Sequence, residues 1–206
     1  MGVLALQGGF EAHARMLRRL GVDVREVRVA ADLDGLDGLV IPGGESTTMT
    51  LGIAREGLAE PLRELITPAR DGHHGREGSD GGRDPDDRRG IPVLGSCAGL
   101  IMLDRDHLAL MDIRARRNAF GRQTHSFEAD VQVAGIDGPP LRGVFIRAPW
   151  IAEYGPDVQI LAEVDGHAVA ARQGDVIAVA FHAELTDDDR VHRLLLDAIA
   201  QRRAGT

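Results

Sequence analysis

One cysteine stands in a setting that suits nucleophilic catalysis. A short apolar run at residues 91–94 leads into Gly95-Ser96-Cys97-Ala98-Gly99, and a helix is expected over residues 100–105. This is the G-x-nucleophile-x-G pattern of a strand-to-helix elbow, in which the glycines leave room for a tight turn. The helix N-terminus stabilises a thiolate and offers backbone N–H groups to an oxyanion. The same five residues also fit a small buried cysteine, so the interpretation depends on partners elsewhere in the chain.

A cysteine nucleophile needs a base, and the base needs a group that orients it. An apolar run at residues 176–181 ends at His182, two residues before Glu184. Residues two apart in an extended segment point to the same side, so we expect these two side chains to lie together where the strand ends. The other seven histidines lack such a setting; His13 and His192, for example, are expected on helices.

A third segment suits close approach of a ligand to the backbone. Residues 38–41 form a short apolar run that ends in Pro42-Gly43-Gly44-Glu45-Ser46-Thr47-Thr48. Glycines at such a place let backbone N–H groups reach a bound group. An ordinary strand-to-helix turn with Ser46 or Thr47 as the helix N-cap explains the segment equally well.

The elements that must position these segments alternate along the chain. Strands are expected at residues 3–6, 22–29, 38–41, 91–94, 126–134, 144–147, 159–164, 168–172 and 176–181, and helices at 11–20, 48–66, 100–105 and 190–203. The second helix is expected to break at Gly57 or Pro61. Short continuous apolar runs separated by helices predict an α/β fold with an open, mostly parallel sheet flanked by helices. Such a sheet gathers its site at the carboxyl ends of its strands.

The length of 206 residues and an apolar fraction of 43% suit one domain with a real core. Residues 67–90 differ from the rest, because Ala69 is their only aliphatic residue among glycines and charges. This stretch buries too little apolar surface to offset its ordering entropy. We therefore expect a single domain over residues 1–206 with a flexible surface insertion at 67–90. The adjacent His73 and His74 make only a weak metal site, and no metal is expected elsewhere.

Composition excludes several classes of function. A net charge of −8 and an aromatic content of 3% disfavour nucleic-acid binding. All 24 basic residues are arginine, which excludes a Schiff-base or phosphate-loop lysine. The single cysteine excludes an internal disulfide and fits a reducing compartment. The chain shows neither a signal peptide nor an apolar run long enough to span a membrane, so a soluble cytoplasmic protein is expected.

Taken together, the motifs resemble class I, triad-type glutamine amidotransferases. More narrowly, they are similar to the glutaminase subunits of pyridoxal 5′-phosphate synthase, with the matching segments in family order over nearly the whole chain. These segments are residues 3–8, 41–48, 95–100, 117–123, 126–128, 145–149 and 181–186. The resemblance implies a flavodoxin-like, amidotransferase-type α/β fold and no cofactor. The PGGEST and RNAFGRQ segments are far more specific than the elbow, which many amidotransferases share.

The resemblance also implies a role for each site residue. Cys97 attacks the side-chain amide of L-glutamine, His182 acts as base and then acid, and Glu184 orients His182. The backbone N–H groups of Gly44 and Ala98 form the oxyanion hole. The positions that match the family's glutamine contacts are Gly44, Glu45, Ser46, Arg117, Ile146 and Arg147.

The partner implied by the resemblance is a separate lyase subunit. In this family the lyase is a TIM barrel that uses the ammonia to build pyridoxal phosphate, and its dodecameric core carries the glutaminase subunits. The absence of lysine agrees with this division of labour, because sugar-imine chemistry needs a lysine amine. The chain departs from the family pattern at Ala183, where proline is usual, and at His125, where aspartate is usual.

Three other functions remain open at this point. The chain could serve another synthase, such as imidazole glycerol phosphate synthase, although the RNAFGRQ and FIRAP segments argue against it. A catalytically weak scaffold is supported only by Ala183 and the altered loops, and Cys97, His182 and Glu184 count against it. A plain cysteine hydrolase would not need the segments that match the glutamine contacts.

Overall fold

The computed structural model describes residues 1–67, 90–117 and 126–204. The predicted insertion at 67–90 lies outside these residues except for its two ends, and so do His73 and His74. Residues 118–123 of the RNAFGRQ segment and His125 also lie outside them. The remaining site residues predicted from the sequence are all described.

Five parallel strands form the half of the main sheet that contains the predicted site. Their order is β2 (Arg25–Val27), β1 (Gly2–Leu4), β3 (Leu39–Ile41), β4 (Val93–Ser96) and β11 (Val176–Val179). Every residue of the four inner strands is buried, which is why they appear in the sequence as continuous apolar runs. β2 is an edge strand and is shorter than the predicted 22–29.

Antiparallel strands extend the sheet beyond β11. β10 (His167–Gln173) pairs with β11, then β8 (Trp150–Tyr154) and β5 (Ile113–Arg116) follow, while β9 (Gln159–Val164) also pairs with β10. The sequence analysis did not predict β5 or β8. β5 contains two arginines and β8 has three exposed residues at its end, so neither shows a clear apolar pattern.

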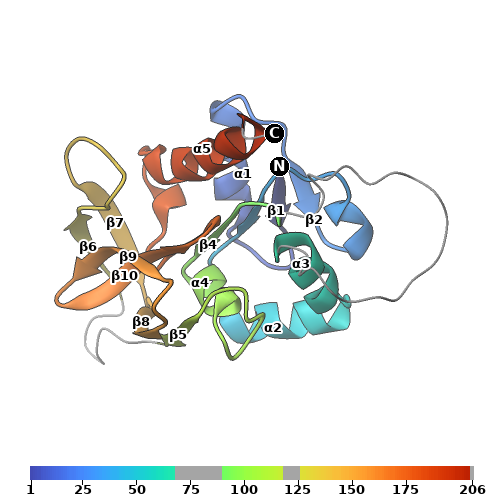
Figure 1. The fold of residues 1–206 in the computed structure, drawn as a ribbon, viewed down its shortest axis with the longest axis horizontal. Helices are drawn as coiled ribbons and strands as arrows, with labels where there is room; N and C mark the ends of the chain where they lie inside the picture. The colour runs from blue at the N-terminus through green and yellow to red at the C-terminus, as the bar shows by residue number, and fades with distance from the viewer. Residues whose placement is uncertain (68–89, 118–125, 205–206) are drawn as a thin grey trace.

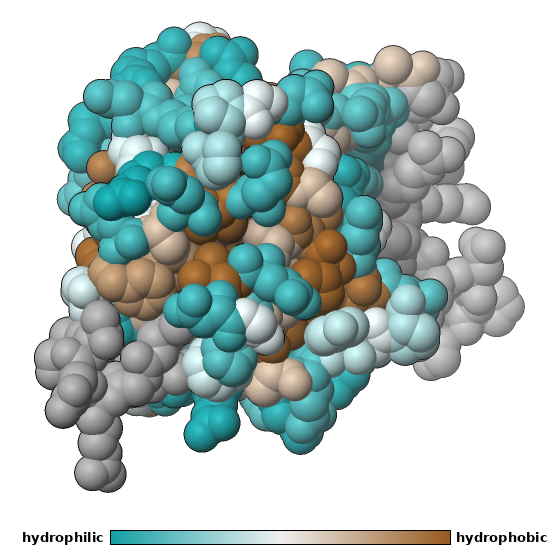
Figure 2. All heavy atoms as spheres, turned by 90° about the vertical axis from the view of Figure 1, so that its left-hand side faces the viewer, coloured by the Kyte–Doolittle hydropathy of each residue, from teal (hydrophilic) through white to brown (hydrophobic). Residues whose placement is uncertain are grey.

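A separate hairpin, β6 (Ser126–Val131) and β7 (Leu141–Ile146), lies beside this antiparallel end (Figure 1). Phe127 of β6 stacks on Phe145 of β7 with ring centroids 4.6 Å apart, and the tilted contact of Phe145 with Phe181, at 5.6 Å, connects the hairpin to the body. Figure 2 shows apolar side chains at the centre of this end of the molecule, with polar side chains around them. The hairpin is therefore held to the body by burial of aromatic side chains.

Helices cover both faces of the parallel strands. α1 (Phe10–Arg19) and α5 (Arg190–Ala204) lie on one face, and α2 (Ser46–Arg55), α3 (Ala59–Ile66) and α4 (Ala98–Leu103) lie on the other (Figure 1). The predicted break between α2 and α3 occurs at Gly57, which has a φ of +63° that favours glycine. Within residues 1–67, 90–117 and 126–204, no helix has the length and apolar character to cross a membrane.

Candidate active site

The site lies where three neighbouring parallel strands end. β3, β4 and β11 are adjacent in the sheet, with Ile41 opposite Gly95 and Ser96 opposite Val179. Because the strands run in the same direction and in register, the segments that follow them meet at one edge. Those three segments are the glycine-rich turn, the cysteine elbow and the His182 turn.

The elbow holds Cys97 in a backbone conformation that is rare for any residue with a side chain. Its φ is 51° and its ψ is −104°, and it forms the N-cap of α4. The flanking glycines make this geometry possible. A Cβ on Gly95 would lie 2.8 Å from the carbonyl of Gly99, and one on Gly99 would lie 2.0 Å from the carbonyl oxygen of Ile41. Backbone strain of this kind is typical of functional sites.

The strained turn directs the thiol toward the predicted partners. The Cys97 N–H donates to the carbonyl of Val179 at 2.8 Å, which ties the elbow to β11. Its Sγ lies 4.0 Å from the carbonyl oxygen of Ile146, at the end of β7. A Cβ on Gly43 would lie 2.4 Å from Cε1 of His182 and 3.4 Å from Cβ of Cys97. The two side chains therefore flank the same glycine.

His182 and Glu184 are in direct contact. Nδ1 of His182 lies 2.6 Å from Oε1 of Glu184, within hydrogen-bond distance. The sequence analysis expected this pairing from an extended segment, and that reason is wrong. Residues Ala183–Leu185 form a short 3-10 helix, η3, and the turn rather than a strand brings the two side chains together. Since a carboxylate only accepts, Nδ1 carries the hydrogen.

The electrostatics of this pair favour a charged imidazole. Burial lowers the pKa of His182, but the Cys97 thiol and the Glu184 carboxylate outweigh burial and raise it to about 10. Burial raises the pKa of Glu184, but His182 and the nearby His13 bring it below its usual value. The pair is therefore an imidazolium beside a carboxylate.

Two further polar side chains contact Glu184 and a third lies behind one of them, and the sequence analysis gave none of the three a role. The Oγ of Ser96 lies 3.3 Å from Oε2 of Glu184, and Nε2 of His13 lies 3.2 Å from the same oxygen. Nδ1 of His13 lies 2.9 Å from Nε2 of His192. The sequence did contain a signal that His13 is buried. Met16 and Leu17 follow it by three and four residues, which places all three on the buried side of α1.

The glycine-rich turn is held by side chains from two other segments. Glu45, rather than Ser46 or Thr47, is the N-cap of α2, and its carboxylate accepts from the N–H groups of Thr47 and Thr48 at 3.0 and 2.7 Å. These bonds lower the pKa of Glu45 to about 2. Arg117 lies 3.4 Å from the same carboxylate. Two predicted glutamine contacts are thus brought together.

Gly44 and Ser46 flank Glu45 in this turn. Gly44 has a φ of +137°, and a Cβ there would lie 2.6 Å from the side-chain amide of Gln7. That amide bonds to both the N–H and the carbonyl of Glu45, each at 3.1 Å. Ser46 is buried as the first residue of α2. Gln7 therefore fixes the turn, a role that the sequence analysis did not assign.

The last predicted positions come from the two remaining segments. Ile146 ends β7 and is partly exposed, and Arg147 follows it with a φ of 45°. Ala98 is the buried first residue of α4. In the part of the chain that the structure describes, no group of three or more histidine, cysteine or acidic side chains is arranged to hold a metal ion.

This fold and this site define a class of protein. Its members are α/β proteins with a cysteine elbow, a histidine and a carboxylate at the sheet edge. The model of the SNO glutamine amidotransferase family matches residues 3–76 and 86–201. The chain belongs to this family.

Individual relatives agree with this assignment. The chain is 44% identical over 214 residues to the pyridoxal 5′-phosphate synthase subunit PdxT of Frankia alni, covering 100% of this chain and 97% of that protein. It is 43% identical to the subunit of the same name from Streptomyces coelicolor, covering 100% and 96%. A crystal structure of a glutamine amidotransferase superposes with a TM-score of 0.81 at 37% identity, covering 97% of this chain and 98% of that one.

Proposed function

We propose that this chain is the glutaminase subunit of a pyridoxal 5′-phosphate synthase and hydrolyses L-glutamine to L-glutamate and ammonia. The observation that carries the proposal is the contact chain from Cys97 through His182 to Glu184 at the carboxyl edge of the sheet. A nucleophile, a base and an orienting carboxylate are the parts that acyl transfer from an amide requires. Family membership and the names of the PdxT relatives support this choice of substrate.

In the first half of the reaction, Sγ of Cys97 attacks the side-chain carbonyl carbon of glutamine. Because Nδ1 of His182 is engaged by Glu184, Nε2 is the nitrogen that takes the proton of the Cys97 thiol, so a thiolate attacks beside the imidazolium. The C–N bond of the tetrahedral intermediate then breaks, and His182 gives its proton to the departing ammonia. The product of this half is a thioester between the substrate's acyl group and Cys97.

In the second half, water replaces ammonia. His182, now neutral, takes a proton from the water as it attacks the thioester carbon. The C–S bond breaks, L-glutamate leaves, and the cysteine–histidine pair returns to its starting charge. Glu184 keeps the imidazole in one tautomer and orientation through both halves.

The backbone N–H groups of Gly44 and Ala98 are proposed to stabilise the oxyanion. Among the described residues, neither N–H donates to another protein group. Ala98 begins α4 directly after the nucleophile, where helix N–H groups lack partners within the helix. The rigid turn that Gln7 holds keeps Gly44 in place.

The remaining predicted contacts are proposed to bind the polar end of glutamine. Glu45 stays ionised because its pKa is about 2, so it can accept from the substrate's ammonium group. Arg117 lies beside Glu45 and suits the substrate's carboxylate. Ser46, Ile146 and Arg147 complete the proposed set.

The ammonia is proposed to pass to a lyase subunit of TIM-barrel fold, in an assembly with a dodecameric lyase core. The names of the PdxT relatives, which mark them as one subunit of a synthase, support a partner of this kind. The chain has no lysine for imine chemistry of its own, which agrees with a partner that carries it out.

Glutamate release from glutamine, measured with and without the lyase subunit, tests this function. We expect release by the parent protein and a loss of at least about a thousandfold in Cys97→Ala, because removing a nucleophile leaves only binding and oxyanion effects. Co-sedimentation with the lyase subunit should survive this substitution. Equal release by parent and Cys97→Ala would overturn the nucleophile assignment. No release by the parent under either condition would overturn the function.

A further inference from the structure

Two fully buried histidines lie behind Glu184, and one of them approaches the carboxylate oxygen that His182 does not contact. His13 comes from α1 and His192 from α5, and the relative exposure of each is 0%. Nε2 of His13 lies 3.2 Å from Oε2 of Glu184, although without the alignment of a full hydrogen bond, and Nδ1 of His13 lies 2.9 Å from Nε2 of His192. The mechanism proposed above uses neither ring.

The arrangement assigns a tautomer to each ring. Burial lowers the pKa of His13 and lowers that of His192 to about 3, so both rings are neutral near pH 7. Glu184 is a carboxylate and can only accept, so the hydrogen of His13 belongs on Nε2. Nδ1 of His13 is then an acceptor, and His192 must donate to it from Nε2. Each ring therefore carries its hydrogen on Nε2, which faces Oε2 of Glu184 in His13 and Nδ1 of His13 in His192.

Ser96 does not make His13 redundant at this oxygen. Its hydroxyl has one hydrogen and two acceptors within reach, the carbonyl of Phe181 at 3.1 Å and Oε2 of Glu184 at 3.3 Å. The shorter contact is the one to the carbonyl. Oε2 therefore depends on the N–H of His13 for a donor that has no other acceptor among the described residues.

We infer that His13, supported by His192, is a positioning residue for the proposed glutaminase reaction, because it holds the outer oxygen of Glu184 so that the inner oxygen faces His182. The inference rests on the proposed function. The terminal torsion of a glutamate is broad, so a carboxylate held at one oxygen alone can rotate. With Nδ1 of His182 at one oxygen and Nε2 of His13 from α1 within 3.2 Å of the other, the carboxylate loses that freedom.

The alternative is that both rings merely fill space between α1, α5 and the sheet. Filling space would be served as well by leucine, without the cost of burying ring nitrogens, of which Nδ1 of His192 has no partner among the described residues. The groups that face the histidines are Glu184, His182 and, toward His192, Asp189. Instead, His192 contacts His13, His13 contacts Glu184, and Glu184 contacts His182 of the reacting pair.

The first test compares His13→Leu with His13→Gln, using His107→Gln as the matched control at a histidine that contacts a different buried carboxylate. We expect His13→Leu to lower kcat for glutamine about tenfold, with KM unchanged within about twofold, because an orienting contact acts on the reacting pair rather than on substrate binding. His13→Gln should recover most of the loss, since its amide N–H can replace Nε2–H. His107→Gln should match the parent.

The decisive test repeats the change in a Glu184→Gln background. If His13 acts through the carboxylate, His13→Leu should cost less than about twofold there, whereas a structural role lowers kcat by the same factor in both backgrounds. An NMR titration of the His182 ring gives a readout without turnover. Its pKa should fall in His13→Leu, because a misplaced carboxylate stabilises the imidazolium less.

The outcomes separate this inference from the function on which it rests. If the parent releases no glutamate in a manner that depends on Cys97, the proposed function fails and the inference fails with it. If the parent is active and His13→Leu behaves like His107→Gln, or if the losses multiply fully in the double variant, only the inference fails. Circular dichroism and the rate of Cys97 alkylation identify a variant that has lost its fold. If His13→Leu is such a variant, the kinetics and pH profile of His13→Gln decide whether the inference holds.

Discussion

In the part of the chain that the structure describes, two buried carboxylates each bind a histidine, and one of them lies at the proposed active site. Glu184 contacts Nδ1 of His182 at 2.6 Å, and Asp104 contacts Nδ1 of His107 at 2.7 Å. Both carboxylates are almost inaccessible, with side-chain exposures of 2%. The distance and burial of a histidine–carboxylate pair therefore do not identify a catalytic pair.

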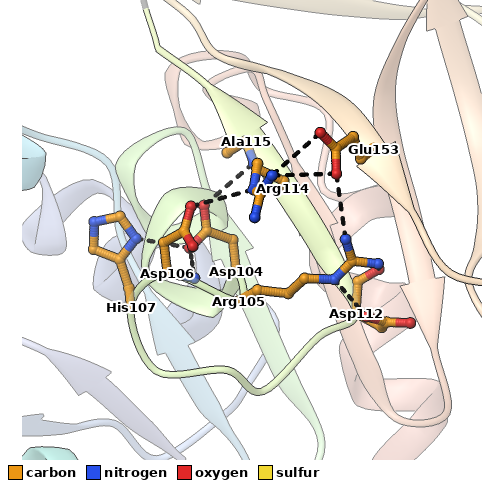
Figure 3. A network of polar contacts seen from close by, with 8 residues as sticks. All are labelled: Asp104, Arg105, Asp106, His107, Asp112, Arg114, Ala115 and Glu153. Carbon is orange, nitrogen blue, oxygen red and sulfur yellow. Dashed lines mark hydrogen bonds and ion pairs between the residues drawn. The ribbon is translucent and has the colours of Figure 1, made fainter.

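The difference lies in what else each carboxylate binds. Asp104 accepts from the backbone N–H groups of Asp106 and Ala115 at 2.9 and 3.2 Å, so it fastens the loop after α4 to β5 (Figure 3). Around it, Arg105 and Arg114 form ion pairs with Asp112, Asp106 and Glu153. Glu184 is surrounded instead by side chains from three elements. One carboxylate thus stabilises a loop, and the other orients a ring that contacts a thiol.

The largest expected contrast between the two pairs comes from matched amide substitutions. Glu184→Gln should lower kcat by about a hundredfold or more, because an amide neither stabilises the imidazolium nor holds its tautomer. Asp104→Asn should leave kcat per folded molecule within about twofold and lower the free energy of unfolding by about 1–3 kcal/mol, because its NH₂ group would face backbone donors. Steady-state kinetics and urea unfolding measure both effects.

The comparison fails if the two variants show the same pattern. A large loss of kcat in correctly folded Asp104→Asn would mean that the loop after α4 takes part in the reaction. An unchanged kcat in Glu184→Gln would remove Glu184 from the proposed triad and leave His182 to act alone.

A second prediction concerns the space around each ring. The ring of His182 is confined, whereas that of His107 is partly exposed. A Cβ on Gly43 would lie 2.4 Å from Cε1 of His182, well inside contact distance. Gly43→Ala should therefore displace the ring and lower kcat by about tenfold or more, as small misplacements of reacting groups are costly. Gly8→Ala is the control, because a Cβ there would meet nothing within 4 Å. Similar kinetics for the two variants would show that the ring has room to move.

The four inner strands of the parallel half could be predicted from the sequence because they are buried on both faces. Runs such as residues 38–41 and 91–94 contain no polar residue, and they overlap β3 and β4. β5 could not be predicted, because its Arg114 and Arg116 are stabilised by tertiary contacts that no local pattern contains. Local periodicity thus predicts buried elements and misses exposed edges.

The same limit applied at the site. Gly95-Ser96-Cys97-Ala98-Gly99 could be interpreted as an elbow because the pattern is contiguous in the chain, although the close approach that requires Gly99 is to Ile41 of β3. The contact between His13 and Glu184 joins residues 171 positions apart in the chain, so no spacing rule predicts it. Even the correct pairing of His182 with Glu184 was expected for the wrong reason, since a strand and a 3-10 turn both bring such residues together.

A third prediction uses the histidines behind Glu184, which have no counterpart among the contacts that the structure describes for Asp104. In the folded protein the pKa of His192 is about 3, whereas an unfolded histidine binds a proton below about pH 6.5. The unfolded state therefore binds more protons between these values, and the stability present above pH 6.5 is lost as the pH falls toward 3. The expected slope is about 1.4 kcal/mol per pH unit for one proton.

Urea unfolding of the parent and of His192→Leu at pH 7, 6, 5 and 4 measures this slope. Removing the histidine should remove its share, so the free energy of unfolding of the variant should fall less steeply with acidification. Parallel curves would show that His192 is protonated equally in the folded and unfolded states, contrary to its complete burial.

The smallest expected effect concerns the residue that separates His182 from Glu184. Ala183 is the first residue of η3, a position where proline fits because its missing N–H is not needed within the helix. His182 precedes it with φ −90° and ψ 88°, outside the helical region that a following proline disfavours. Ala183→Pro should therefore raise the free energy of unfolding by about 0.4–1 kcal/mol, through a less flexible unfolded chain.

Catalysis should change little in Ala183→Pro, because the turn already holds the ring and the carboxylate 2.6 Å apart. We expect kcat to stay within several-fold of the parent. Ala183→Gly is the comparison variant, because it loosens the same turn instead of restricting it as the proline ring does. A gain of orders of magnitude in the proline variant would mean that the natural turn misaligns His182 and Glu184. That result would overturn the contrast with Asp104, since the pair at the site would then be the less ordered of the two.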